Sequence, residues 1–275
     1  MFSWRAEVRP GVWVAFTDAD AGNLALHVGD DPADVRRRRG GLEAALGLAG
    51  RGFHYMNQVH GNAVAGIGGA SAGRTLDQAG APDQVRAQAQ AGVQTDAGGA
   101  PTADAMVSLG EPLAVMVADC VPIILVGDRA AGETPVLGVV HAGRPGVASG
   151  VVPAAVSRMR GLGAAELSAW IGPSVCGGCY EVPEEMRADV SARVPAAWCT
   201  TSRGTPGLDL PAAVHSQLRD AGVRVEYSGS CTLEDETLFS YRRDRHTGRF
   251  AGLVWTVSRA ADGGRSDAGG GRPGE

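Results

Sequence analysis

The sequence contains no lysine, so all 25 of its basic residues are arginine. This absence excludes mechanisms that need a lysine amine at a defined place, namely a Schiff base to pyridoxal phosphate, a phosphate-binding P-loop and a protein-kinase site. With 30 acidic residues the formal net charge is −5. Because phosphate affinity depends on accumulated basic charge, we expect no nucleic-acid partner and favour a small molecule.

Long hydrophobic runs are also absent. No segment approaches the roughly 18 uninterrupted apolar residues of a membrane span, and residues 1–10 lack the apolar centre of a secretory signal. Cysteine is scarce, and its odd count of five in 275 residues argues against a disulfide framework. We therefore expect a cytoplasmic protein with no membrane partner, whose reduced thiols are available for metal binding or catalysis.

Hydrophobic periodicity predicts a mixture of strands and helices without a regular βα repeat. The predicted strands are residues 12–16, 113–118, 122–126, 136–140, 167–171, 223–227 and 251–257, and the predicted helices are residues 34–48, 147–160, 183–193 and 210–221. The arginines at 36–39 are interpreted as a solvated helix face.

Low-complexity composition sets the expected limits of the domain. Residues 66–101 are interpreted as a flexible excursion, either a lid or a loop without a role, and residues 259–275 as a disordered tail. Residues 1–258 then form one catalytic domain. A hydrolase-like GASAG at 69–73 and a dinucleotide-like fingerprint at 269–274 fall in these segments, so we discard both.

Three short segments place reactive side chains beside glycines or at strand ends: NQVHG with His60, ADCVP with Cys120, and VHAGRPG with His141. Cys120 is expected at an interruption between two strands, because Pro122 cannot donate a hydrogen bond to a neighbouring strand. Singly, each residue has an ordinary structural explanation. Together, two imidazoles and one thiolate are the ligands of a catalytic zinc site whose fourth position is open, and copper suits the same ligands. Separations of 60 and 21 residues do not resemble a zinc finger.

Longer motifs occur in a family-specific order: NQVHG, ADAMVS, PLAVMVADCVPIIL, GVVHAGRPG, WIGPSVCGGCYEV and CTLEDETLFSYRRDRHTGR. From about residue 12 to residue 255 the chain resembles the multicopper polyphenol oxidase, or laccase-domain, family. Members are also described as purine nucleoside phosphorylases and as peptidoglycan editing factors.

The resemblance implies an α/β (α+β) fold with a β-sandwich core of mixed sheets flanked by helices, as four α/β/β/α layers in one domain. It also implies that His60, Cys120 and His141 are both the zinc ligands and the catalytic residues. The implied reactions are phosphorolysis of adenosine, inosine and methylthioadenosine, and deamination of adenosine. The implied partners are a nucleoside and phosphate.

Further residues are candidates for substrate binding. They are Asn57, Gln58, Arg144, Tyr180, Arg242 and Arg243. Arg242 and Arg243 are adjacent, and their guanidinium groups can hold phosphate oxygens by bidentate hydrogen bonds. The chain departs from the family after His-Ala-Gly, where the family has Trp then Arg and this chain has Arg144 then Pro145.

Other polar residues near the motifs leave alternatives open. Asp119 and Glu181 are candidate acids. Cys176 and Cys179 form a CxxC that is either a second metal or redox site or a turn near the pocket, and the turn is favoured because no second CxxC or histidine pair completes a tetrahedral site.

Rival functions use the same three residues. Cys120 with His60 or His141 as its base would make a hydrolase that edits peptidoglycan precursors. Copper-dependent oxidation of polyphenols is a second rival, although six histidines are too few for the copper clusters of a multicopper oxidase. A structural metal-binding protein is the non-enzymatic alternative. The resident metal and the oligomeric state stay open.

Overall fold

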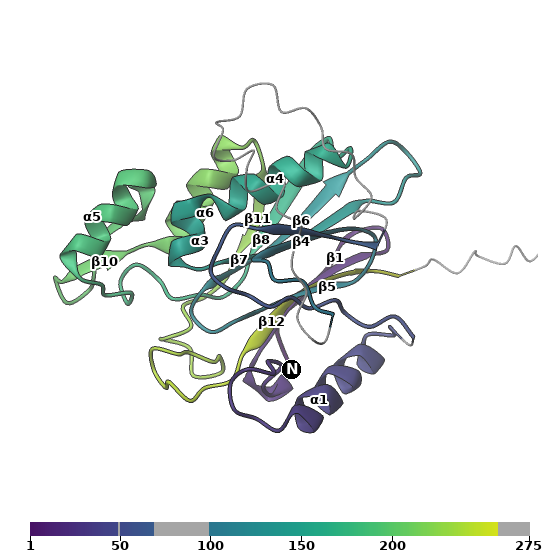
Figure 1. Cartoon of the computed structure of the whole chain (residues 1–275), viewed down its shortest axis with the longest axis horizontal. Coiled ribbons are helices and arrows are strands. Elements are labelled where there is room, and N and C mark those ends of the chain that lie inside the picture. The colour runs from purple at the N-terminus through teal and green to yellow at the C-terminus, as the bar shows by residue number, and fades with distance from the viewer. Residues whose placement is uncertain (49, 69–98, 258–275) are drawn as a thin grey trace, which may run out of the picture.

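Two stacked β-sheets form the centre of the computed structural model, which describes residues 1–48, 50–68 and 99–257 (Figure 1). The six-stranded sheet has the order β11 (Arg224–Ser228), β8 (Glu166–Ile171), β6 (Val121–Asp128), β7 (Val136–Ala142), β4 (Ala105–Leu109) and β3 (Val64–Ile67). The four-stranded sheet has the order β1 (Phe2–Arg9), β2 (Val12–Thr17), β12 (Phe250–Thr256) and β5 (Leu113–Val117). A separate hairpin joins β9 (Trp198–Thr200) and β10 (Pro206–Leu208).

The larger sheet is mixed and the smaller one is antiparallel. In the larger sheet β11 pairs with β8, and β3 with β4, in the parallel direction, whereas the pairs between them are antiparallel. All three pairs of the smaller sheet are antiparallel. Mixed pairing agrees with the prediction of a fold without regular βα units.

Side-chain alternation along the strands divides the core into layers. In β6, Ile123 and Leu125 face one hydrophobic cluster while Ile124 and Val126 face another. The second cluster lies between the sheets, where Phe16 is fully buried. Full burial of such a side chain stabilises the fold by roughly 1.5–3 kcal/mol. The period of two thus supplies an apolar face to each neighbouring layer.

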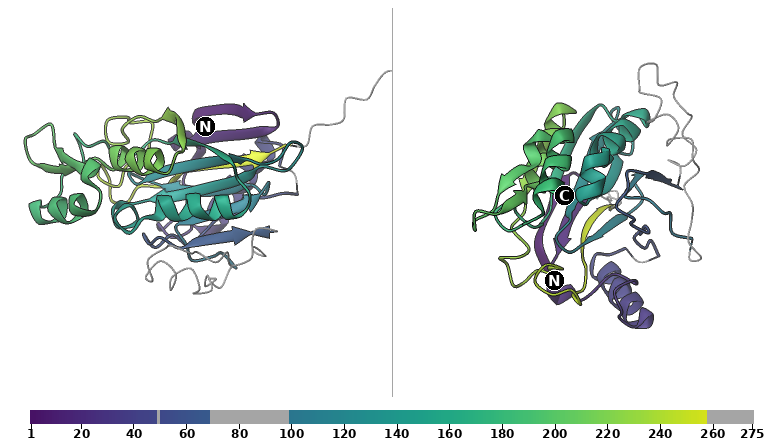
Figure 2. Two further views of the ribbon diagram at one scale, coloured as in Figure 1. Left: turned by 90° about the horizontal axis from the view of Figure 1, so that it is seen from above. Right: turned by 60° about the vertical axis from the view of Figure 1, so that its left-hand side comes forward.

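Helices cover the outer faces of both sheets (Figures 1 and 2). Those beside the larger sheet are α3 (Arg144–Ser149), α4 (Val151–Gly161) and α6 (Leu210–Asp220), while α5 (Glu184–Arg193) packs against the β9–β10 hairpin. On the other side α1 (Pro32–Ala45) packs Leu42 against Leu253 and Trp255 of β12. Short 3-10 turns occupy Ala19–Ala21 and Pro195–Ala197. The predicted α/β/β/α arrangement is confirmed.

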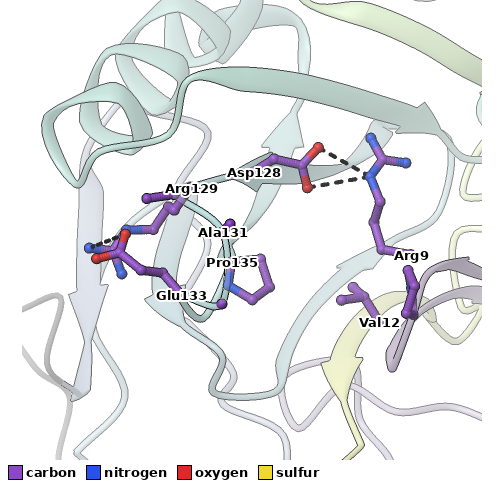
Figure 3. Close-up of a pocket in the computed structure, with 10 residues that line it drawn as sticks. Arg9, Val12, Asp128, Arg129, Ala131, Glu133 and Pro135 are labelled. Carbon is purple, nitrogen blue, oxygen red and sulfur yellow. Dashed lines mark hydrogen bonds and ion pairs between the residues drawn. The ribbon is translucent and has the colours of Figure 1, made fainter.

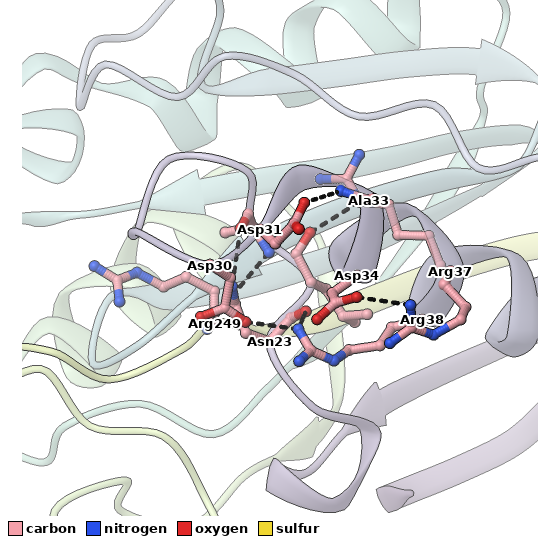
Figure 4. Close-up of polar contacts among 11 residues, drawn as sticks. Asn23, Asp30, Asp31, Ala33, Asp34, Arg37, Arg38 and Arg249 are labelled. Atoms are coloured by element: carbon pink, nitrogen blue, oxygen red, sulfur yellow. Dashed lines mark hydrogen bonds and ion pairs between the residues drawn. The ribbon is translucent and has the colours of Figure 1, made fainter.

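Polar contacts fix α1 to the loop before it (Figure 4). Arg38 pairs with Asp30 at 2.6 Å, and its Nη1 donates to the Asn23 carbonyl at 3.3 Å. Arg39 donates to the Leu24 carbonyl at 2.8 Å. The interpretation of residues 36–39 as a solvated face therefore holds for the exposed first two arginines and is wrong for the half-buried last two.

Most predicted elements occur, with shifted ends. The predicted helix at 147–160 is two helices, because Gly150 has φ +83° and separates α3 from α4. Strands β1, β3, β4, β9 and β10 were not predicted. Of the proposed excursion, residues 69–98 lie outside the described residues, as do the tail from 259 and both discarded motifs. None of the described helices is long and apolar enough to cross a membrane.

Candidate active site and metal centre

His60, Cys120 and His141 come together although they are far apart in the sequence. One ligand atom from each lies within 4.8 Å of the others, and His60 Nε2 is 3.7 Å from Cys120 Sγ. The imidazole rings of His60 and His141 meet edge to face, with centroids 4.6 Å apart. His141 is 3% exposed whereas His60 is exposed. The cluster is therefore closed on the His141 side and accessible beside His60.

The backbone turns sharply at two of these positions. Cys120 lies where the chain passes from β5 of the smaller sheet to β6 of the larger one. Asp119 has φ +83° and His60 has φ +60°, and they are the two non-glycine residues with positive φ in the described part of the chain. Such conformations cost about 1–3 kcal/mol and collect at functional sites. The expected interruption between strands lies at Asp119 and Cys120, since Pro122 is inside β6 and opposite His141.

Asp104 joins the two histidines and was not singled out from the sequence. Its carboxylate is fully buried and accepts from the backbone N–H groups of His60 at 2.9 Å and Gly61 at 2.6 Å. Nδ1 of His141 lies 2.8 Å from the same carboxylate. Because Nδ1 is engaged there, Nε2 of His141 is left for a metal or for Cys120.

Gly143 permits the close packing of the cluster. A β-carbon at this position would lie 2.6 Å from His60 Cδ2 and 3.2 Å from Cys120 Sγ. The glycine after His-Ala is thus required by the space that the ligand side chains occupy.

Cys120 and His141 perturb each other's protonation. Burial alone raises the pKa of the Cys120 thiol, but His141 and His60 outweigh it and bring that pKa to about 6. Burial lowers the pKa of His141, whereas the Cys120 thiolate and Asp104 raise it to about 9. Between these values the metal-free pair is a thiolate beside an imidazolium.

The donor set fits a metal ion. Two imidazole nitrogens and a thiolate match the three protein ligands of catalytic zinc sites, and the accessible side beside His60 matches the open fourth position. The contact between Asp104 and His141 is the carboxylate–histidine arrangement that orients zinc-binding imidazoles.

Three of the predicted substrate residues form a group near the cluster. Arg242 stacks over the Tyr180 ring, with its guanidinium carbon 4.3 Å from the centroid, and Arg144 contacts the Tyr180 hydroxyl. Burial and the nearby Cys120 raise the pKa of Tyr180, against the lowering influence of Arg242 and Arg144. A neutral phenol and two cations are thus held together within electrostatic reach of Cys120.

The other predicted substrate residues make structural contacts. The Gln58 side chain makes two hydrogen bonds with the main chain of Met116: Nε2 donates to its carbonyl at 2.7 Å, and Oε1 accepts from its N–H at 3.0 Å. The Arg243 guanidinium donates to several carbonyls of residues 232–238, including that of Thr232 at 2.9 Å. Asn57 is exposed and donates to Thr102 at 3.3 Å.

The two candidate acids are also engaged. The Asp119 carboxylate accepts from the Thr232 hydroxyl and from the Arg242 backbone N–H, each at 2.7 Å. Glu181 pairs with Arg203 at 2.7 Å. The first contact holds the loop that carries Cys120, and the second lies at a more exposed position.

Two further basic residues near the cluster were missed. The lowered pKa of His27 is caused by burial and then by charges that include Arg249, His141 and His60. Arg249 has a pKa that burial lowers and that Cys120 and Asp119 raise. Both residues therefore lie within electrostatic reach of the cluster, and neither stood in a segment that combined reactive side chains with glycine.

A separate hollow lies at the other end of β6, where Asp128 is the last residue (Figure 3). Its charged side chains pair with each other, Arg9 with Asp128 at 3.2 Å and Arg129 with Glu133 at 3.3 Å. We assign it no chemistry, since these pairs already satisfy the charges and the clustered reactive residues lie at the opposite end of the strand.

The profile of a family described as multi-copper polyphenol oxidoreductase laccase matches residues 10–257. The chain belongs to this family. The resemblance inferred from the motifs is confirmed. Among curated family relatives, purine nucleoside phosphorylase ORF3 of Streptomyces griseus is 44% identical over 91% of this chain and 96% of its own length. Purine nucleoside phosphorylase Rv2149c of Mycobacterium tuberculosis is 44% identical over 86% and 85%.

Solved structures agree on the fold. NMB0706 of Neisseria meningitidis has a TM-score of 0.71 at 30% identity and covers 93% of this chain and 99% of its own. YlmD of Geobacillus stearothermophilus has a TM-score of 0.72 at 28% identity, with coverage of 94% and 100%. The fold of the described residues is therefore shared with these solved structures.

Proposed function

We propose that this chain is a purine nucleoside phosphorylase. The observation that carries the proposal is the open cluster of His60, Cys120 and His141 beside the cationic group of Arg144, Tyr180 and Arg242. Curated relatives with 44% identity bear the name purine nucleoside phosphorylase, which supports the same assignment. The proposed substrates are adenosine, inosine and methylthioadenosine.

In this reaction an oxygen of phosphate forms a bond to the anomeric carbon of the ribose, and the bond from that carbon to the purine nitrogen breaks. The purine leaves with the bonding electron pair and takes a proton. We assign phosphate binding to Arg144 and Arg242, because guanidinium groups bind phosphate oxygens in bidentate geometry. Tyr180 is the proton donor to the substrate, since its raised pKa keeps the hydroxyl protonated.

We assign the metal ligands to His60, Cys120 and His141, with Asp104 orienting the His141 ring. Zinc bound there supplies Lewis-acid chemistry to an oxygen of the substrate or of water, and copper is the alternative metal. The same Lewis-acid chemistry supports adenosine deamination as a second proposed activity. We also propose a cytoplasmic location, in line with the sequence.

The test is to incubate the purified protein with adenosine and with inosine, each with and without phosphate, and to separate the products by chromatography. Phosphate-dependent release of adenine and hypoxanthine supports the phosphorylase, and inosine formed from adenosine without phosphate supports deamination. The absence of products from every incubation would rule out the nucleoside assignment.

A matched pair of arginine variants tests the phosphate site. Arg242→Gln should raise the KM for phosphate by about 10- to 100-fold, because a hydrogen bond to a charged group contributes roughly 1.5–3 kcal/mol. Arg219→Gln removes the same charge from α6, where the side chain is 69% exposed, and should leave this KM unchanged. Equal KM values in both variants would contradict the assignment.

The geometry also favours a second candidate, a cysteine hydrolase that edits peptidoglycan precursors. Cys120, His141 and Asp104 are arranged as nucleophile, base and orienting carboxylate, and the pKa of the thiol is about 6. Hydrolysis of muropeptides that persists after chelation and is abolished by iodoacetamide would support this candidate. Activity that depends on added zinc would count against it.

A further inference from the structure

A second set of metal-type ligands lies outside the site described above. Cys176 and Cys179 follow β8, while Cys231 and Glu234 follow β11. Their ligand atoms all lie within 4.8 Å of one another. Glu234 Oε1 is 3.2 Å from Cys179 Sγ and 3.8 Å from Cys176 Sγ. We propose that these four residues bind a structural zinc ion, and we call them the three-cysteine cluster.

The donor chemistry selects zinc. Soft thiolates favour zinc over magnesium or calcium, and four protein ligands make a closed tetrahedral site of the structural kind. With Zn–S bonds of 2.3 Å, neighbouring sulfurs of a tetrahedral site are roughly 3.8 Å apart. With a Zn–O bond of about 2.1 Å, the oxygen–sulfur separation in such a site is roughly 3.6 Å. The two distances from Glu234 Oε1 to the sulfurs bracket this value, and all four ligand atoms lie within 4.8 Å of one another, so a zinc ion requires only small side-chain movements. Cys231 is 9% exposed and Glu234 is exposed, which places the carboxylate on the solvent side.

The main chain holds the sulfur atoms in place. The backbone N–H groups of Cys179 and Tyr180 donate to the Cys176 carbonyl at 3.0 and 2.9 Å, which closes the CxxC turn. The Cys176 N–H donates to Cys231 Sγ at 3.4 Å, a contact that orients metal-binding thiolates. The two segments are joined by the bridge between Ser174 and Cys231. Three of the four ligands are therefore positioned by main-chain contacts.

The three-cysteine cluster is connected to Cys120 through Asp119. The Asp119 carbonyl accepts from the N–H of Val175, which adjoins Cys176, at 3.0 Å. Its carboxylate accepts from the hydroxyl of Thr232, which adjoins Cys231. A metal ion that fixes both segments would thus hold Asp119 in its positive-φ conformation. The cluster is a positioning element for the neighbouring loop.

Zinc content per chain tests the proposal, measured by mass spectrometry after purification and dialysis. We expect the Cys176→Ser/Cys179→Ser variant to contain one equivalent fewer than wild type. Cys199→Ser is the matched control, because this thiol also lies next to the CxxC turn, against Gly177, but outside the cluster. Equal zinc contents in wild type and the double variant would overturn the proposal.

Cobalt substitution keeps the test valid if the double variant does not fold. Cys120→Ser leaves the three-cysteine cluster intact. It should retain about three quarters of the wild-type thiolate-to-cobalt absorption, because three of the four metal-binding thiolates remain. This variant also separates the two sites, since it removes a ligand only from the other one. Loss of the entire thiolate–cobalt band in Cys120→Ser would overturn the proposal.

Discussion

Replacing Asp104 by Asn should damage both the fold and the metal centre. The carboxylate is fully buried, and each of its oxygens accepts two hydrogen bonds. One oxygen accepts from the His60 N–H and contacts His141 Nδ1, and the other accepts from the N–H groups of Val59 and Gly61. In asparagine one of these oxygens becomes an NH₂ group that faces two former donors.

The magnitude follows from those contacts. A hydrogen bond to a charged group contributes roughly 1.5–3 kcal/mol, so the loss of two costs about 3–6 kcal/mol. This is a large part of the ~5–15 kcal/mol that stabilises a typical domain. If the NH₂ group faces His141 instead, Nδ1 must accept a hydrogen bond and the ring proton moves to Nε2. That tautomer has no lone pair for a metal, so zinc affinity should fall about 10- to 100-fold.

The assay combines urea unfolding of the metal-free protein with zinc competition against a chromogenic chelator. Asp128→Asn is the control, because Asp128 lies at the far end of β6 in a partly exposed pair with Arg9, and such a surface pair contributes about 0–1 kcal/mol. The reasoning is refuted if the Asp104 variant matches the Asp128 variant in both the free energy of unfolding and zinc affinity.

Three further predictions follow from the site and its helices. Gly143→Ala should lower zinc affinity at least about tenfold, because the new methyl group would meet His60 and Cys120. The control is Gly41→Ala in α1, where the methyl group meets nothing within 4 Å and zinc affinity should stay unchanged. Equal zinc affinities in the two variants would contradict the steric argument. In metal-free protein, alkylation of Cys120 should reach half its maximal rate near pH 6, and His141→Ala should move that midpoint upward, which iodoacetamide kinetics will measure. The urea midpoint of the metal-free protein should stay nearly constant from pH 6.5 to 9, because the two pKa shifts act in opposite directions on stability: the contribution of Cys120, whose pKa is lowered from 9.0 to about 6, grows as pH rises, while that of His141, whose pKa is raised from 6.5 to about 9, is lost; a steep change of the midpoint across this interval would oppose this.

The sequence predicted the convergence of His60, Cys120 and His141, because each lies in a segment with glycine or strand-end character that limits where its side chain can go. Asp104 was missed since its role depends on pairing between distant segments. The amphipathic alternation of β1 was a usable signal that was overlooked, as its burial alternates along Phe2–Arg9. The domain boundary at residue 258 stays a prediction.

The three-cysteine cluster shows a second limit of sequence reasoning. A CxxC alone favours a turn, and its completing residues come from a segment more than 50 positions later. Parallel pairing of β8 and β11 brings the two segments together. Such pairing is not specified by local periodicity, so the ligand count could not be obtained from the motif.

The position of Cys120 between the two sheets has a consequence for how the protein matures. Cys120 also directly precedes β6, whose Pro122 is opposite His141 of β7, and His60 precedes β3 of the same six-stranded sheet. The larger sheet alone therefore brings the three ligands together, before the smaller sheet docks on it. Metal acquisition at this centre is thereby an early event in biogenesis, and pulse-labelled refolding would record it once the larger sheet has formed.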